Sequence, residues 1–514
     1  MYNRGPFADW VPKPLMLLLI IFFLFAIMTV SGVYTSVLTD LTGALATYSE
    51  YASMANNAGT IGMGIAITIL MRVKMRFRSK EIIAGSSIIL ATLSIMCATT
   101  DNPYVLIVCS FLIGFFKMFP MIEMILPVMF ILSPTGDRGK FYAIFYPLAI
   151  GFGQLSSYYF AKMVFNNSWE TPYYYMAIIM LLIAACSLIF QHNQRFCRKL
   201  PLYHIDWLSI ILLSSSFMSF NYFFVFMKQQ AWFNSPYIIG SLILGMLLFG
   251  LLIYRQKFIK RKLIDFSVFK RSNVKHSFIL LVFLGIYLAS SSVFMQYSVG
   301  VLGYNNLINA EINLWMIPGV IIAGVMAFYG FKNKWPMKYY IAAGFIAFFL
   351  HTLCLYFLIS PQMDIDYLKY SMMIKGLGMG ILFIGIWFYA CLDLDMSETM
   401  GMMPILLSFR SFVATAFGGA IIGWASYQAQ WQSLSDVSVY WDATQIANGM
   451  QMYQSAMLNS LMSSGKIILG TLLWLIIPIL VLVFTHHYGV FKHRRLVLFR
   501  RAIRGNSIKG FKIK

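Results

Sequence analysis

Long apolar runs separated by short polar connections dominate the pattern of this 514-residue chain. An α-helix needs about 20 mainly apolar residues to cross a bilayer. Fourteen stretches reach roughly that length, and we predict membrane spans at 14–36, 52–71, 81–100, 104–131, 141–163, 172–191, 207–227, 235–254, 276–299, 310–330, 339–359, 370–390, 401–425 and 466–487. The pattern therefore predicts an all-α polytopic membrane protein with 14 transmembrane helices.

The polar connections predict how the chain is oriented in the membrane. Lys and Arg concentrate in every second connection and in the C-terminal tail, at 72–80, 137–140, 195–199, 255–275, 332–338 and 492–501. Cytoplasmic loops carry the excess of Lys and Arg, so both termini are expected in the cytoplasm. The one long connection, 426–465, is polar and almost free of these cations. It is expected to be a loop on the outer side.

Composition excludes a soluble protein. Hydrophobic residues make up 60% of the chain and charged residues 11%, whereas soluble domains are about 25% charged. The net charge of +21 would indicate nucleic acid binding in a soluble protein, but here the cations follow the connections between spans. The six cysteines show no metal or redox spacing, and we expect no metal and no cofactor.

Four charged residues interrupt the apolar runs. The stretch LIGFFKMFPMIEMILPVMF at 112–130 contains Lys117 and Glu123, and two later spans contain Lys375 and Arg410. A charge at the centre of a membrane helix costs about 2.5–3.5 kcal/mol even on lenient insertion scales. Because of that cost, ionisable residues at membrane depth indicate function by default.

Two interpretations of these charges remain open from the sequence. In the first, Glu123 is the proton carrier, and Lys117, Lys375 and Arg410 bind substrate or act as its charge partners. In the second, Glu123 forms a structural ion pair that joins two helices. Glu123 and Arg410 should lie at similar depth, since each is about nine residues from the cytoplasmic end of its helix.

Weaker candidates lie near the ends of spans. Asp393, Asp395 and Glu398 form a predicted cytoplasmic turn, which is either a gating latch between domains or a solvated turn. Glu311 is expected to cap a helix N-terminus. Amide residues also lie inside predicted spans. We interpret four of them as hydrogen-bonding between helices rather than as lining a cavity: Asn56, Asn57, Gln154 and Asn221. For His351, a proton-relay role is the less favoured interpretation.

Several motifs together resemble a known family. The best matches are IDWLSIILL (205–213), LIDFSVFKRSNVKHSFILL (263–281), VGVLGYNNLINAEINLWMIPGVI (299–321), IKGLGMGILF (374–383) and LLSFRSFVATAFGGAIIG (406–423). In this order they resemble the fourteen-helix drug:proton antiporter branch of the major facilitator superfamily, of which the chain looks like a divergent member. Lys375 stands where the family has an arginine, and Arg410 matches a family arginine. The connection MRVKMRFRSKE (71–81) lacks the Asp and Gly usual there, and the first span has no acid.

The resemblance implies an architecture of two pseudo-symmetric six-helix bundles. The bundles would be 1–191 and 263–487, with two extra transmembrane helices in 192–262 and a basic cytoplasmic tail at 488–514. Transport would proceed by rocking of the bundles around a central site.

The resemblance further implies a proton-coupled antiporter that exports hydrophobic or amphipathic compounds across a bacterial inner membrane. Some family members work with a periplasmic adaptor and an outer-membrane channel, which are the partners to expect besides substrate, protons and lipid. The cations in the spans also favour an alternative, a carrier of one endogenous anionic lipid or metabolite that is not necessarily proton-coupled. An enzyme is not expected, because the chain has no Gly-x-Ser-x-Gly nucleophile motif.

Overall fold

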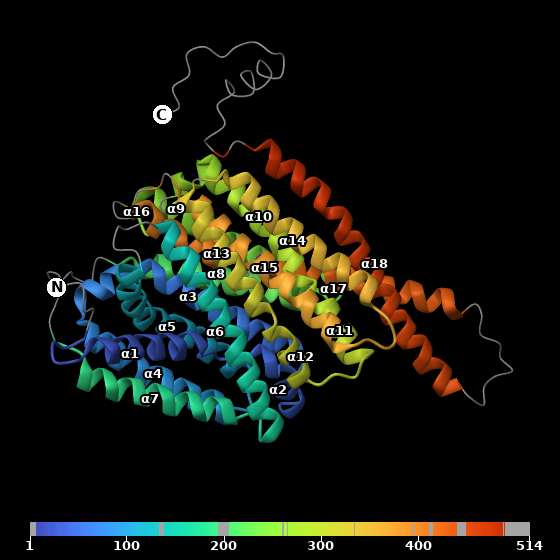
Figure 1. Cartoon of the computed structure of the whole chain (residues 1–514), viewed down its shortest axis with the longest axis horizontal. Coiled ribbons are helices and arrows are strands. Elements are labelled where there is room, and N and C mark those ends of the chain that lie inside the picture. The colour runs from blue at the N-terminus through green and yellow to red at the C-terminus, as the bar shows by residue number, and fades with distance from the viewer. Residues whose placement is uncertain are drawn as a thin grey trace, which may run out of the picture.

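The computed structural model describes residues 7–132, 138–193, 205–259, 262–264, 266–333, 335–392, 394, 396–410, 415–438, 449–486 and 488. Within these ranges every regular element is a helix (Figure 1). In lipid the backbone must satisfy its own hydrogen bonds, and helices do so within one segment. The predicted all-α membrane fold is confirmed.

The helices follow the predicted spans. The N-terminal half comprises α1 (Lys13–Thr29), η2 (Thr35–Val37), α2 (Leu38–Ala44), α3 (Ser49–Arg76), α4 (Ser79–Thr99), α5 (Pro103–Leu132), α6 (Arg138–Asn166) and α7 (Thr171–Phe190). Two helices follow, α8 (Trp207–Phe226) and α9 (Pro236–Phe258), with η4 (Trp232–Asn234) between them and η5 (Phe266–Lys270) after them. The C-terminal half comprises α10 (Ser272–Ala289), α11 (Ser291–Gly300), α12 (Asn306–Leu314), α13 (Met316–Lys332), α14 (Met337–Leu358), α15 (Ile365–Ala390), α16 (Met396–Ser408), α17 (Thr415–Ser438) and α18 (Gly449–Thr485).

The number of spans is compatible with the prediction. In the described residues, 11 helical segments are long and apolar enough to cross a membrane. The other three predicted spans coincide with α1, with α6 and with the α16–α17 pair. Figure 1 shows the blue helices of the N-terminal half on one side of the molecule and the yellow to red helices of the C-terminal half on the other.

A glycine contact joins α3 to α5 in the N-terminal half. A Cβ added at Gly62 would lie 2.2 Å from the Phe111 carbonyl oxygen, and one added at Gly114 would lie 1.9 Å from the Gly59 carbonyl oxygen. The two backbones therefore approach more closely than any side chain permits. Small residues at helix interfaces are the usual means of such packing in membranes.

The same contact recurs between α13 and α15 in the C-terminal half. A Cβ at Gly319 would lie 2.0 Å from the Met373 carbonyl oxygen, and one at Gly376 would lie 2.2 Å from the Met316 carbonyl oxygen. In both halves the two contacts are three residues apart on each helix. This repetition at the level of single atoms supports two structurally related halves.

The extra helices pack on each other and on both halves, with α8 against α3 and α17. Asp206 caps α8 by accepting hydrogen bonds from the Ser209 backbone N–H and hydroxyl, and it pairs with Arg255 of α9 at 2.9 Å. Burial acts to raise the pKa of Asp206, but the hydrogen bonds from Arg255 and Ser209 outweigh burial and hold that pKa below its ordinary value. The Ile-Asp-Trp motif thus marks the start of α8, and its Asp206 also joins α8 to α9.

The structure corrects three of the predicted span interiors. The first span stops being helical after Thr29, and the spans at 276–299 and 310–330 each divide into two helices, at Ser290 and at Trp315. Hydropathy reports only how apolar a stretch is, so it does not detect where the backbone leaves the helix within one span.

The prediction that the whole of 426–465 is a loop is wrong. Helix α17 continues to Ser438 and α18 begins at Gly449, so most of the stretch is helical, and residues 439–448 lie outside the described residues. The two helices pack against each other, with Ala429 and Ala456 buried. A hydropathy pattern ends where a helix leaves the membrane, although the helix itself continues. The basic tail lies outside the described residues except for Tyr488.

Candidate functional site

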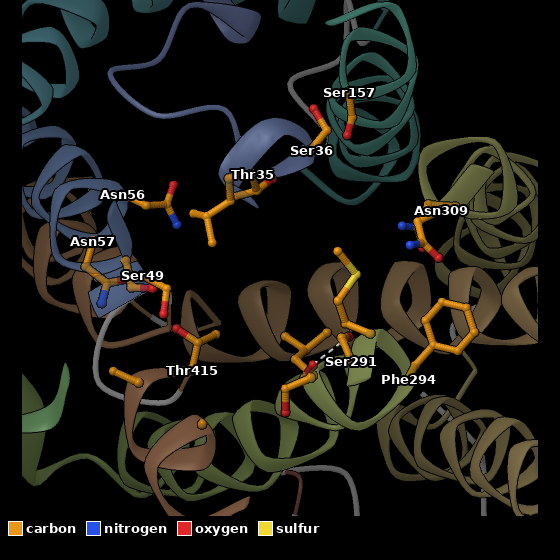
Figure 2. Close-up of a pocket in the computed structure, with 18 of the residues that line it drawn as sticks. Thr35, Ser36, Ser49, Asn56, Asn57, Ser157, Ser291, Phe294, Asn309 and Thr415 are labelled. Carbon is orange, nitrogen blue, oxygen red and sulfur yellow. Dashed lines mark hydrogen bonds between the residues drawn. The ribbon is translucent and has the colours of Figure 1, made fainter. Parts of the chain in front are cut away.

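A cavity of about 930 Å³ lies between the two halves (Figure 2). Its walls come from η2, α2, α3 and α6 of the N-terminal half, from the end of α8, and from α10, α11, α12, α13, α15 and α17. The described residues that line it are Thr35, Ser36, Leu38, Thr39, Ser49, Glu50, Ser53, Asn56, Asn57, Gly153, Gln154, Ser157, Phe224, Val225, Lys228, Leu288, Ser291, Ser292, Phe294, Met295, Asn306, Asn309, Ala310, Asn313, Met316, Lys375, Met379, Thr415, Ala416, Gly419 and Ala420.

The lining is unusually rich in hydroxyl and amide groups for a bundle of membrane helices. Fifteen of the 31 described lining residues are Ser, Thr, Asn or Gln. Three are charged: Glu50, Lys228 and Lys375. Such a lining offers many hydrogen bonds to a polar solute, together with an apolar surface that also suits a hydrophobic compound.

Lys375 is the one predicted site residue that the structure places in the cavity wall. Its side chain is buried, and its Nζ donates a hydrogen bond of 2.7 Å to the Ser291 hydroxyl at the start of α11. Within the described residues no carboxylate lies at ion-pair distance from it. A buried ammonium without a counter-ion favours an anion or a strong hydrogen-bond acceptor in the cavity.

Lys117 lies outside the cavity lining and binds the broken end of α1. Its Nζ donates hydrogen bonds to the backbone oxygens of Met28 at 2.8 Å and Val30 at 2.9 Å. The last carbonyls of a helix have no partner inside it, and a cation there also complements the helix dipole. Gly32 allows the chain after α1 to pass close to α5, since a Cβ at that position would lie 2.1 Å from the Ser110 hydroxyl. The ammonium of Lys117 therefore stabilises the segment that leads to Thr35 and Ser36 in the cavity wall.

The Lys117→Met variant is expected to lower the thermal stability of the purified protein. It removes two charge-assisted hydrogen bonds and leaves both carbonyls without this donor, at about 1–3 kcal/mol for each buried unsatisfied group. Thermal unfolding in detergent checks the change. Lys162→Met, at a residue exposed to solvent near the end of α6, is the control, and an unchanged Tm for Lys117→Met contradicts the capping role.

Glu123 is buried outside the cavity lining, where the ends of α3, α4 and α5 meet. Its Oε2 accepts a hydrogen bond of 2.7 Å from Ser79, the first residue of α4. Its Oε1 lies 3.3 Å from Lys74 Nζ, an ion-pair contact without hydrogen-bond geometry. These contacts fit the second of the two interpretations, because Glu123 ties the α3–α4 connection to α5.

Arg410 also lies outside the cavity lining. Its guanidinium lies over the rings of Phe383 at 4.6 Å and Trp387 at 5.6 Å, both on α15, and it interacts with the Tyr146 hydroxyl of α6. Arg410 thus joins α16, α15 and α6 through aromatic contacts. Glu123 and Arg410, which were predicted at similar depth, have different partners.

The predicted cytoplasmic turn is described only in part. Glu398 accepts a hydrogen bond of 2.6 Å from Arg271, which precedes α10, so this pair joins two segments of the C-terminal half. Asp393 and Asp395 lie outside the described residues. The gating role of the three acids stays a prediction.

Two weaker candidates have structural partners. Glu311 is the sixth residue of α12, and the N-terminal cap is instead Asn305, whose side chain accepts from the Ile308 N–H. The interpretation of Glu311 as a cap is therefore wrong, because α12 begins at Asn306, five residues before Glu311. His351 lies 2.9 Å from both the backbone oxygen and the hydroxyl of Ser371, which explains its burial.

The amide residues in the spans have mixed roles. Asn57 donates a 3.0 Å hydrogen bond to Asn221, which in turn donates to the Met54 backbone oxygen, so α3 and α8 are joined as predicted. Asn56 and Gln154 line the cavity instead. The orientation of each helix decides between these roles.

Sequence reasoning missed the amides of α12. Asn306, Asn309 and Asn313 all line the cavity, and their spacing of three and four residues places them on one face of a helix. That spacing is visible in the sequence. It predicts a polar helix face and is the signal that could have found them.

One contact joins α2 to α12 beside the cavity. The Asn306 side chain donates to the Thr39 hydroxyl and, at 2.7 Å, to the Asp40 carboxylate. Asp40 and Thr39 belong to the N-terminal half and Asn306 to the C-terminal half. This cluster therefore bridges the two halves beside the cavity.

Comparison with known proteins supports the fold. No family model and no curated protein matches the chain. Among solved structures, the nucleoside transporter NupG matches with 13% identity and a TM-score of 0.54, over 92% of this chain and 99% of that one. An auto-inhibited POT family peptide transporter matches with 12% identity and a TM-score of 0.51, over 92% and 98%. At these identities the likeness shows that the chain has the fold of these transporters, and it leaves the major facilitator superfamily and its fourteen-helix branch predictions.

Proposed function

We propose that this protein is a secondary transporter that moves small polar solutes through the cavity by alternating access. The observation that carries the proposal is the cavity itself, which lies between the two halves and is lined by hydroxyls, amides and the buried Lys375. Rocking of two bundles around a central site is the usual way in which such folds expose one site to each side of the membrane in turn.

In this proposal Lys375 binds the substrate group that carries negative charge or a strong acceptor. Among the described residues its Nζ has one hydrogen bond, to Ser291, and an ammonium has three donors. The remaining donors are available to a solute. This supports the carrier of an anionic metabolite over the exporter of hydrophobic compounds.

The exporter remains the second candidate, because Phe224, Val225, Leu288, Met295 and Met379 give the cavity an apolar portion. Proton antiport, export and a periplasmic adaptor with an outer-membrane channel belong to this candidate and stay predictions. The bacterial inner membrane with both termini in the cytoplasm stays a prediction for both.

The bridge at Asn306 offers a direct test of alternating access. Thr39→Cys combined with Asn306→Cys places two thiols at a contact between the halves. Oxidation is expected to link the halves and stop transport in proteoliposomes, and a reductant is expected to restore it. The Thr39→Cys variant alone, which has the same native cysteines, is the control.

The transport assay uses radiolabelled glutamate, citrate, uridine, glucose and glycylglycine, with tetraphenylphosphonium as a hydrophobic cation. We expect uptake or release of at least one polar solute that the oxidised double variant loses. Movement of tetraphenylphosphonium alone would favour the exporter. Unchanged transport after verified cross-linking contradicts rocking at this contact.

A further inference from the structure

Asn309 is a buried amide to which the described part of the chain offers no hydrogen-bond partner. Its side chain is 3% exposed, and neither its Nδ2 nor its Oδ1 has a hydrogen-bond partner among the described residues. It lines the cavity, and Figure 2 shows its amide directed toward the open centre. Buried polar groups in proteins are almost always hydrogen-bonded, so each exception calls for an explanation.

Its neighbour one turn away shows the contrast. Asn306 lies on the same face of α12, and both Thr39 and Asp40 accept hydrogen bonds from its amide nitrogen. The amide nitrogen of Asn306 therefore donates its hydrogen bonds within the protein, whereas the amide of Asn309 is available to a ligand in the cavity. The Ser36 hydroxyl, which also lines the cavity, is likewise buried without a partner in the described chain.

Only some ligand groups can form hydrogen bonds with both the Nδ2 and the Oδ1 of an amide side chain. A primary amide presents a donor and an acceptor side by side. A carboxylate offers acceptors only, so it would pair with Nδ2 and leave Oδ1 unpaired. A ligand edge with one donor beside one acceptor pairs with both atoms at once, as a carboxamide, a lactam or the edge of a nucleobase does.

We propose that Asn309 is a specificity-determining residue that binds such a donor–acceptor edge of the substrate. The inference rests on the proposed function and narrows its substrate class to polar solutes that contain an amide, lactam or nucleobase edge. Lys375 binds a separate acceptor of the same solute. Sites that hydrogen-bond a substrate group reject analogues without that group, because the buried partner is left unpaired.

Matched pairs of small probes test the edge directly. Uracil and nicotinamide present a donor beside an acceptor, whereas 1,3-dimethyluracil and N,N-dimethylnicotinamide keep the rings and lose the donors. Binding to the purified protein in nanodiscs is measured by calorimetric titration, without a gradient. In the wild type we expect at least one parent compound to bind about tenfold or more tightly than its methylated analogue, since one hydrogen bond to a buried group is lost.

Two variants assign the preference to one residue. Asn309→Leu is expected to remove the difference within each pair. Asn309→Asp keeps an acceptor for the ligand N–H but loses the donor to the ligand carbonyl, so it is expected to weaken both members of each pair and to keep a difference between them. The control Asn167→Leu removes an exposed amide just after α6, outside the cavity lining, and it should keep the preference. Thermal unfolding confirms that each variant is folded.

Three outcomes overturn the proposal: no difference within either pair in the wild type, a preference that survives in Asn309→Leu, or loss of the preference in Asn167→Leu. Failure here is separable from failure of the proposed function. A wild type that transports a polar solute without an amide edge, with Asn309→Leu equally active, leaves the transporter standing and rejects the role of Asn309.

Discussion

Lys375→Gln is expected to lower the transport rate at low substrate concentration by about 100-fold. Removal of one partner of a buried, hydrogen-bonded charge costs about 2–5 kcal/mol, and each 1.4 kcal/mol is about a factor of ten. Lys375 is the buried cation of the cavity wall, so the substrate group that it binds loses its partner. Initial uptake in proteoliposomes, with the solute found in the transport assay, measures the effect.

A stability measurement separates binding from a structural role. Ser291 also donates a hydrogen bond of 2.7 Å to the Leu288 backbone oxygen, so its hydroxyl keeps a partner when the ammonium is gone. Removal of a buried charge without a counter-ion also relieves a desolvation cost. We therefore expect Lys375→Gln to unfold at a temperature no lower than that of the wild type.

Lys228→Gln is the matched control. Lys228 also lines the cavity, but its side chain is exposed and lies 5.9 Å from the Tyr427 ring centroid. An exposed charge contributes little, so its loss should change transport by less than a few-fold. Near-normal transport by Lys375→Gln, or an equal loss in Lys228→Gln, rejects Lys375 as the binding cation.

Glu123→Ala is expected to lower the free energy of unfolding by about 3 kcal/mol, the lower end of the range for breaking a buried ion pair. The lower end applies because Lys74 keeps 18% of its side chain exposed. The variant also leaves the Ser79 hydroxyl without its acceptor. Chemical or thermal unfolding in detergent measures the loss, and Ser79→Ala, which removes one hydrogen bond, should cost only about 1 kcal/mol.

The Glu123→Gln variant decides between the two interpretations of this carboxyl. It keeps an acceptor for Ser79 and removes the charge. Because Glu123 lies outside the cavity lining and is engaged by Ser79 and Lys74, we expect any solute-driven proton movement that a pH-sensitive dye detects in wild-type proteoliposomes to persist in the variant. Loss of proton movement in a folded Glu123→Gln protein that still binds solute would instead establish Glu123 as the proton carrier.

The arrangement of charges shows where sequence reasoning reached its limit. Lys117 and Lys375 look alike in the sequence, as single lysines within apolar helical runs. In the structure Lys117 binds the carbonyls of Met28 and Val30, and Lys375 lines the cavity. The difference depends on the break in α1 and on how each helix is rotated, neither of which hydropathy records.

The cavity lining shows the same limit. Asn309 and the other amides of α12 look like ordinary polar residues near the start of a span, because a sequence does not say which helix faces another across a gap. Glu123 was correctly identified as unusual from its position in an apolar run. Its partners Lys74 and Ser79 belong to the basic connection 72–80, where their contact with α5 required the folded chain.

The sequence by itself determined the class of this protein: a membrane protein of many helices whose basic connections predict its orientation. It did so because lipid imposes one requirement, apolar helices of sufficient length, and that requirement is local in the chain. Only the tertiary structure decided which polar groups meet in the cavity and which ones fasten helices together. Those roles depend on distances between segments far apart in sequence, such as 2.7 Å between Lys375 and Ser291.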